Sequence, residues 1–205
     1  SGLLIGGALG KKGPEPTGET DEPAGETTEA VETTGIPLPP AVMEKTTEDG
    51  FTYRIENGEA IITGCPKDDA FIVFPDQLEG CTVTVIDEGC MEGDTVVECV
   101  LLPIECAEIR ANAFAGCTEL RGLYLPAGTE TIGPDAFAGC IAMESIYIPG
   151  SILEVSEGAF EDCVSLLYLF YEGDFESWNA VCDDFINPFT TAICLDGNYY
   201  QGAGH

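Results

Sequence analysis

The sequence contains one histidine, His205, and this histidine is the last residue of the chain. The scarcity excludes most Ser-His-Asp triads and most zinc sites, because both depend on imidazole side chains held inside a fold. A glycine-rich phosphate loop, a Cys-x-x-Cys pair and an EF-hand loop are also missing from the sequence. We therefore predict a binding protein with no catalytic residues, no metal and no cofactor, and not an enzyme.

Basic residues are scarce as well, since 7 Lys and Arg stand against 37 Asp and Glu, giving a formal net charge of -30. This charge repels phosphate backbones and anionic lipid heads, so it predicts no nucleic-acid partner and no binding to a membrane surface. No apolar run reaches the roughly 18 to 20 residues of a transmembrane helix. The sequence therefore predicts no transmembrane segment in this chain. The acidity would attract basic partners or divalent cations, although a solvated surface is the simpler interpretation.

Large apolar residues are rare between positions 10 and 50, where Thr, Glu, Pro and Gly predominate. Such a stretch cannot bury enough surface to offset its ordering entropy, so residues 1–49 are predicted to be a disordered spacer. Residues 3–9 are apolar and two lysines follow them. Two interpretations of this segment stay open, namely the remnant of a signal or anchor segment and an unstructured terminus.

Order is expected to begin near Phe51, where apolar and polar residues alternate before the turn pair Asn57 and Gly58. Alternation followed by Asn-Gly is typical of a β-hairpin. Residues 50–85 are therefore predicted to form an N-terminal hairpin cap and a first rung.

The middle of the chain repeats with an offset of 23 residues. Four apolar positions of the repeat stay in register, and their members are Ile86, Ile109, Ile132 and Val155; Met91, Phe114, Phe137 and Phe160; Val97, Leu120, Met143 and Leu166; Val100, Leu123, Ile146 and Leu169. A fixed period of this length is typical of a solenoid, in which each unit packs only on its neighbours. The sequence predicts repeats over residues 86–171, in four or five rungs.

Each rung is predicted to contain a short strand and a tight return turn. Leu123 and Leu125 would point inward from one such strand, and Pro126 would end its hydrogen bonding. In residues 172–205, apolar residues at helical spacing follow a candidate N-cap, Asp174. A C-terminal helical cap is therefore predicted, with Trp178 packing in the core of the cap rather than stacking on a ligand.

The repeat unit, Ile-x-x-x-Ala-Phe-x-x-Cys-x-x-Leu-x-x-Ile/Leu-x-Ile/Leu-Pro, resembles the BspA-type leucine-rich repeat of bacterial surface and secreted proteins. Two units match throughout, and they carry Ile109, Ala113, Phe114 and Cys117, and Ile132, Ala136, Phe137 and Cys140. The resemblance covers about residues 51–200. It implies a leucine-rich repeat solenoid, a right-handed β/α-type superhelix that is mainly β with short helical or 3-10 turns. It also implies a secreted or cell-surface bacterial protein, but it carries over no binding residues.

Ten cysteines suggest disulfides in an exported protein. Cys117, Cys140 and Cys163 share one inward position of the repeat, where a cysteine behaves as a small hydrophobe, so buried thiols are predicted there. Outside the repeat, the candidate disulfide pairs are Cys182 with Cys194 and Cys65 with Cys81.

Outward positions of the strands carry a column of large apolar residues, Leu101, Tyr124, Tyr147 and Phe170. Proteins avoid such a stripe on their surface unless something covers it. We predict that the outward face binds a protein or glycan partner through Tyr124, Tyr147, Tyr168, Phe170, Arg121 and Glu144. Cross-strand stacking alone, or cover by the N-terminal segment or a second copy, would also explain the column.

The leading functional prediction is a secreted or cell-surface recognition and adhesion module. A structural spacer or self-association module is the alternative, and a metal-dependent role of the acidic surface is a third. The sequence does not predict the oligomeric state or the ligand.

Overall fold

The computed structural model describes residues 43–182, 190–195 and 199–201. These residues all belong to one compact unit, Pro40–His205. Most of the expected spacer, together with the candidate signal remnant, lies outside the described residues.

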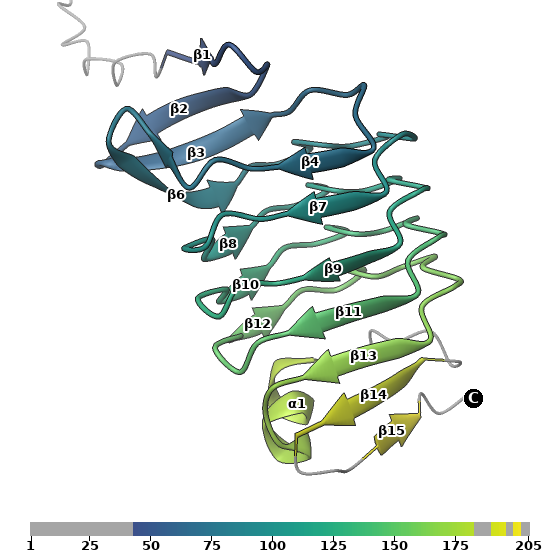
Figure 1. Cartoon of the computed structure of the whole chain (residues 1–205). Helices are drawn as coiled ribbons and strands as arrows, with labels where there is room; N and C mark the ends of the chain where they lie inside the picture. The colour runs from purple at the N-terminus through teal and green to yellow at the C-terminus, as the bar shows by residue number, and fades with distance from the viewer. Residues whose placement is uncertain (1–42, 183–189, 196–198, 202–205) are drawn as a thin grey trace, which may run out of the picture. The chain divides into compact units, whose positions relative to one another are not determined.

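Two sheets form the body of this unit (Figure 1). The order of the first sheet is β1 (Lys45–Thr46), β2 (Thr52–Glu56), β3 (Glu59–Gly64), β6 (Cys81–Ile86), β8 (Glu108–Ile109), β10 (Thr131–Ile132) and β12 (Glu154–Val155), with β5 (Gln77–Leu78) beside β6. The second sheet has seven strands, in the order β15 (Tyr199–Gln201), β14 (Thr191–Cys194), β13 (Tyr168–Tyr171), β11 (Ser145–Ile148), β9 (Gly122–Tyr124), β7 (Cys99–Leu101) and β4 (Phe71–Val73). The chain alternates between the sheets, so the repeats form a solenoid, as predicted.

Parallel pairing follows the offset of the sequence repeat. Ile132 pairs with Ile109 on one side and with Val155 on the other. Strand β4 lies in the predicted first rung and pairs in parallel with β7. At the other end the second sheet continues beyond the expected repeats, because β14 pairs in parallel with β13. The solenoid is therefore longer than the four or five rungs expected.

A turn closes the third side of the four rungs that span residues 86–171. Each turn contains two residues with positive φ, and these pairs are Gly89 and Gly93, Asn112 and Gly116, Asp135 and Gly139, and Gly158 and Asp162. Glycine adopts positive φ without strain, and Asn and Asp tolerate it better than other residues do, which explains the restricted choice at these positions. Backbone bonds from residue i+3 to residue i, such as Cys117 N–H to the Phe114 carbonyl at 3.1 Å, give the turns a 3-10 hydrogen-bond pattern.

The core lies between the two sheets and the turns. Phe114, Phe137 and Phe160 stack along the solenoid, with ring centroids 5.2 and 5.4 Å apart. The ladder cysteines Cys117 and Cys140 are completely buried, which confirms their inward position. Stacking of identical side chains from successive rungs thus removes the apolar surface that one rung alone would expose.

The N-terminal cap is the predicted hairpin. Strands β2 and β3 pair antiparallel, and Asn57 and Gly58 between them have φ values of 54° and 88°. Strand β1 adds to the hairpin within the stretch expected to be spacer, so this end of the stretch is ordered. An ion pair between Lys45 and Glu79, with 2.6 Å between Nζ and Oε2, holds β1 against the cap.

Asp87 links the cap to the first repeats. The guanidinium groups of Arg54 in β2 and Arg110 after β8 both donate to its carboxylate, and Arg110 Nη1 lies 2.7 Å from Oδ1. Arg54 also pairs with Glu56, and Arg110 with Glu108. Burial of Asp87 opposes its ionisation, but hydrogen bonds from the two arginines outweigh this and lower its pKa.

The C-terminal cap contains the helix α1 (Phe175–Val181), which begins after Asp174 as predicted. The Asp174 carboxylate accepts a hydrogen bond from the Ser177 backbone N–H at 2.8 Å, satisfying one of the free donors of the first turn. Trp178 is 2% exposed, and the centroid of its ring lies 5.1 Å from the ring centroid of Tyr171. Its role is therefore packing against the last repeats, as expected.

Candidate functional site

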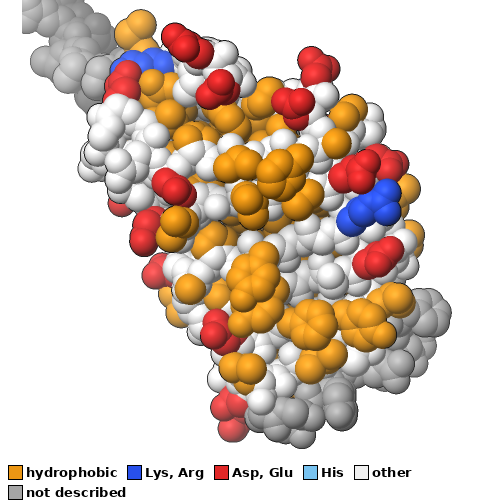
Figure 2. All heavy atoms as spheres, viewed as in Figure 1, with side chains coloured by type: hydrophobic (Ala, Val, Ile, Leu, Met, Phe, Trp, Pro, Cys, Tyr) orange, Lys and Arg blue, Asp and Glu red, His pale blue; other side chains and the backbone are white. Residues whose placement is uncertain are grey.

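The outer face of the second sheet carries the residues that the sequence predicted as a site. Residues alternate along each strand between the core and this face, so β9 buries Leu123 and exposes Tyr124. We call the surface the column face, and its exposed or half-buried large side chains are Phe71, Val73, Leu101, Tyr124, Tyr147, Tyr168, Phe170 and Ile193. Figure 2 shows apolar side chains gathered over these strands, with acidic side chains toward the margins.

Tyr124 and Tyr147 form the centre of the column face. Their rings are parallel within 5°, with centroids 4.2 Å apart, and their strands place them directly opposite each other. A hydrogen bond to the Tyr124 hydroxyl, with partial burial and the nearby Glu172 carboxylate, raises the pKa of Tyr147 to about 12. The pair is therefore one rigid unit, in which each ring covers one face of the other.

Tyr168 and Phe170 extend the surface onto β13. They are 48% and 38% exposed, and their ring centroids lie 6.2 Å apart. Phe170 pairs with Tyr147 across the strands, so the column is continuous from β9 to β13. The four predicted aromatic residues are therefore neighbours on one surface.

Arg121 and Glu144 flank the column at the strand entrances. The Arg121 guanidinium pairs with Glu98 of the preceding rung, with Nε 3.3 Å from Oε2, and the two side chains are 64% and 50% exposed. The Glu144 backbone N–H donates to the Arg121 carbonyl at 2.8 Å, which fixes the position of that rung. An exposed ion pair of this kind contributes little to stability. The side chains of Arg121 and Glu98 are therefore available to contact a partner at the rim of the column face.

Sequence reasoning missed part of the column face. Phe71 and Val73 on β4 are 54% and 53% exposed, and Val73 pairs with Leu101. At the other end, Ile193 pairs with Phe170 at the same offset of 23 residues. Continuing the offset past Phe170 would have found Ile193, whereas the rung from β4 to β7 is longer and breaks the period.

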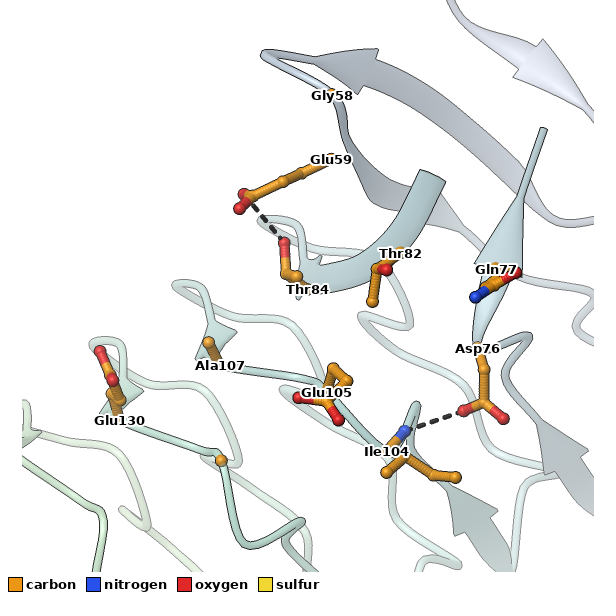
Figure 3. A pocket seen from close by; sticks show the side chains of 11 residues that line it. Gly58, Glu59, Asp76, Gln77, Thr82, Thr84, Ile104, Glu105, Ala107 and Glu130 are labelled. Atoms are coloured by element: carbon orange, nitrogen blue, oxygen red, sulfur yellow. Dashed lines mark hydrogen bonds between the residues drawn. The ribbon is translucent and has the colours of Figure 1, made fainter. Parts of the chain in front are cut away.

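A second feature is a groove of about 900 Å³ on the side where the chain returns to the first sheet (Figure 3). Four carboxylates line it, from Glu59, Asp76, Glu105 and Glu130. Asp76 accepts a hydrogen bond from the Ile104 backbone N–H at 2.8 Å, and Glu59 accepts one from the Thr84 hydroxyl at 3.1 Å. These two carboxylates thus stabilise the connection between rungs, and we assign no ligand to the groove.

Two further findings concern the described part of the chain. Its His, Cys, Asp and Glu side chains nowhere form a group of three or more that is arranged to hold a metal ion. Within residues 43–182, 190–195 and 199–201, no helix has the length and apolarity that a membrane crossing requires.

Known proteins resemble this chain in sequence and fold. The family model described as "BspA type Leucine rich repeat region" matches residues 72–182 in six copies. The crystal structure of a leucine-rich repeat protein from Bacteroides capillosus is 25% identical and has a TM-score of 0.57, covering 63% of this chain and 99% of that one. No curated protein matches the sequence.

Two more distant structures show the same fold. A leucine-rich repeat protein from Eubacterium ventriosum has a TM-score of 0.56 at 14% identity, and the match covers 74% of this chain and 39% of that one. The pneumococcal vaccine antigen PcpA has a TM-score of 0.51 at 14% identity, with 71% of this chain and 41% of that one covered. The chain thus spans less than half of these two proteins.

Proposed function

The chain belongs to the BspA type leucine-rich repeat family, and from this premise we propose that it is a recognition module that binds a protein partner through the column face. We further propose that it acts outside the cytoplasm, secreted or held on a bacterial cell surface, and that it has no enzymatic activity. The observation that carries the proposal is the continuous row of exposed apolar side chains on the second sheet.

The exposed fractions support a binding role for this row. Tyr124 is 64% exposed and Leu101 is 50% exposed, although neither lies on an edge strand of the sheet. Large contiguous apolar surface is rare on soluble monomers and is typical of sites where a partner docks. Tyrosine in such a place offers a large contact area and loses little conformational entropy on binding.

The geometry of the central pair favours a protein over a glycan as the partner. A sugar ring usually packs on the open face of an aromatic ring, but Tyr124 and Tyr147 each use one ring face on the other. Their outward edges and hydroxyl groups are better suited to side chains and backbone groups of a polypeptide. A glycan partner stays the alternative, with Tyr168 and Phe170 as the rings it would use.

Charge gives the partner a second property. The net charge is -30, and Glu98 and Glu144 lie beside the column with Arg121 between them. A partner with an apolar centre and basic groups around it would complement this surface and would associate faster at low ionic strength.

Self-association is the second candidate function. The same apolar column would be covered if two copies packed face to face, and the chain would then be a structural or spacer module. The two functions differ in the oligomeric state of the isolated chain, which light scattering measures.

The test compares two double variants of the full chain. Tyr124→Ala with Tyr147→Ala removes the centre of the column face, whereas Leu153→Ala with Val164→Ala removes apolar side chains that are 67% and 63% exposed outside that face. Arrays of extracellular-matrix and cell-surface proteins, and of glycans, are probed with each. We expect the tyrosine variant to lose at least about tenfold in affinity for a protein target and the control to keep it.

Three outcomes would count against the proposal. Loss of a glycan signal alone would replace the protein partner by a sugar. A stable dimer that only the tyrosine variant dissociates would favour self-association. Equal binding by wild type and the tyrosine variant would remove the column face as a site.

A further inference from the structure

Two thiols approach each other at the end of the solenoid, away from the column face. Cys65 follows β3 in the first rung, and Cys90 lies in the turn that follows β6 in the next rung. The Sγ atom of Cys65 lies 3.7 Å from the Cys90 carbonyl oxygen, and the two thiols are close enough to share a hydrogen bond. The sequence offered Cys81 as a candidate partner of Cys65, and the two are not bonded in the structure.

This pair differs from the ladder cysteines. Cys117 and Cys140 are completely buried, and their thiols donate to backbone carbonyls of the preceding rung at 3.3 and 3.2 Å. An oxidant in solution cannot reach them. Cys65 is only half-buried, whereas Cys90 is 3% exposed. The Cys65 thiol is therefore accessible to solvent, and the Cys90 thiol is shielded from it.

The surroundings divide the two thiols into attacking and resolving groups. The hydrogen bond from Cys90 and the positive charge of Lys67 lower the pKa of Cys65, although burial and the nearby Asp94 oppose this. The same hydrogen bond and stronger burial raise the pKa of Cys90. The accessible thiol is thus the one that ionises first, and the thiolate is the reactive form.

We propose that Cys65 and Cys90 form a disulfide by exchange with an external disulfide, either an oxidised small thiol or an oxidoreductase. The Cys65 thiolate attacks one sulfur of the external disulfide, and the other sulfur leaves as a thiolate. Cys90 then loses its proton and attacks Cys65 Sγ, displacing the second external thiolate. The protein gives up two electrons and two protons, and the external disulfide is reduced to two thiols.

The bond would fasten the first rung to the second. In the second sheet the first rung has a neighbour on one side only, because β4 is the edge strand, so this part of the rung is held less firmly than an internal rung. Lys67 already reaches the Glu92 carbonyl from the same segment, with 3.4 Å between Nζ and the oxygen. The disulfide would join the two rungs covalently in an oxidising compartment, whereas in a reducing compartment only the noncovalent contacts between them would remain.

The test uses the full chain treated with oxidised glutathione, alkylated, and cleaved after glutamate without reduction. Cleavage after Glu88 and Glu92 puts Cys90 in a peptide of four residues, and cleavage after Glu59 and Glu79 isolates Cys65 from Cys81. Mass spectrometry should find these two peptides joined. The oxidised protein should also melt about 5 to 10 °C above the reduced protein.

Matched variants separate this bond from other oxidation. Cys65→Ser and Cys90→Ser should each abolish the linked peptide and the rise in melting temperature, whereas Cys81→Ser and Cys99→Ser should keep both. Linkage of Cys65 to Cys81, a stable glutathione adduct on Cys65, or complete alkylation of both thiols after oxidation would overturn the proposal.

Discussion

The thiol of Cys140 donates a hydrogen bond to the carbonyl oxygen of Phe114, with Sγ 3.2 Å from that oxygen. The same carbonyl accepts the backbone N–H of Cys117 at 3.1 Å, so it joins its own turn to the following rung. Cys163 repeats the relationship with Phe137 at 3.1 Å. A ladder cysteine is therefore both a small apolar side chain and a donor between rungs, which alanine would not be.

This relationship predicts the effect of shortening the side chain. Cys140→Ala should lower the free energy of unfolding by about 1 to 3 kcal/mol, because it leaves a small cavity and removes the thiol donor. Urea denaturation followed by circular dichroism measures the change. Cys99→Ala, at an exposed position, is the control and should change it by less than about 0.5 kcal/mol. An equal effect of both variants would contradict a structural role for the ladder thiol.

The stacked tyrosines predict an unusual titration. The pKa of Tyr147 is raised to about 12 by its hydrogen bond to Tyr124, burial and Glu172. A raised pKa means that the phenol stabilises the fold below about pH 10 and that this contribution is lost as the pH rises through about 12. In a pH titration, phenolate absorbance should therefore show a transition near pH 12, and Tyr147→Phe should remove this transition. Tyr124→Phe should move it to lower pH, and Tyr168→Phe should leave it in place.

Asp87 predicts how acid affects the N-terminal cap. Asp87→Asn should cost about 1 to 3 kcal/mol at neutral pH, because Arg54 and Arg110 lose a charged acceptor that is 15% exposed. Since the pKa of Asp87 is lowered in the fold, its contribution is present above about pH 4 and is lost as the pH falls through the folded value. The stability gap between wild type and variant should therefore narrow as the pH falls below about 4. Asp68→Asn, on the exposed surface, should show no such gap.

Two glycines predict opposite responses to one added methyl group. A Cβ atom at Gly133 would lie 2.7 Å from the Ala111 backbone nitrogen and 2.9 Å from the Arg110 carbonyl carbon. Gly133→Ala should therefore destabilise the protein by about 1 to 3 kcal/mol. Nothing lies within 4 Å of a Cβ atom at Gly128, so Gly128→Ala should be neutral or slightly stabilising. Comparable melting temperatures for the two variants would show that neighbouring rungs separate more easily than this packing implies.

The register of the solenoid could be predicted from sequence because every rung buries the same set of side chains. Ile109, Ile132 and Val155 align in the sequence and pair in the sheet for this reason. The hairpin turn at Asn57 and Gly58 could also be predicted from sequence, because a turn with two consecutive positive φ angles accepts few residue types at those positions.

The donor role of the ladder cysteines could not be predicted in the same way. Sequence alignment shows that Cys117 and Cys140 share a position, but it does not show which backbone group lies next to the thiol. That neighbour depends on the path of the turn between two residues with positive φ, such as Asn112 and Gly116. The approach of Cys65 to Cys90 was missed for a related reason, because the first rung does not follow the 23-residue period.

The candidate site was predictable as a face but not in its detail. Strand alternation places Tyr124, Tyr147 and Phe170 on the outside. It does not reveal that Tyr147 is half-buried, because this depends on how the ring of Tyr124 lies against it. The end of the column on β4 was hidden because the connection that contains β5 lengthens the rung.

Parallel pairing at a constant offset has a consequence for how this molecule changes over generations. A duplication or deletion of 23 residues anywhere between β8 and β12 would join positions that already have equivalent neighbours, so every interface would keep its chemistry. Each insertion or deletion of one 23-residue unit would thus lengthen or shorten the column face by one strand, and the set of buried side chains in the remaining rungs would stay the same.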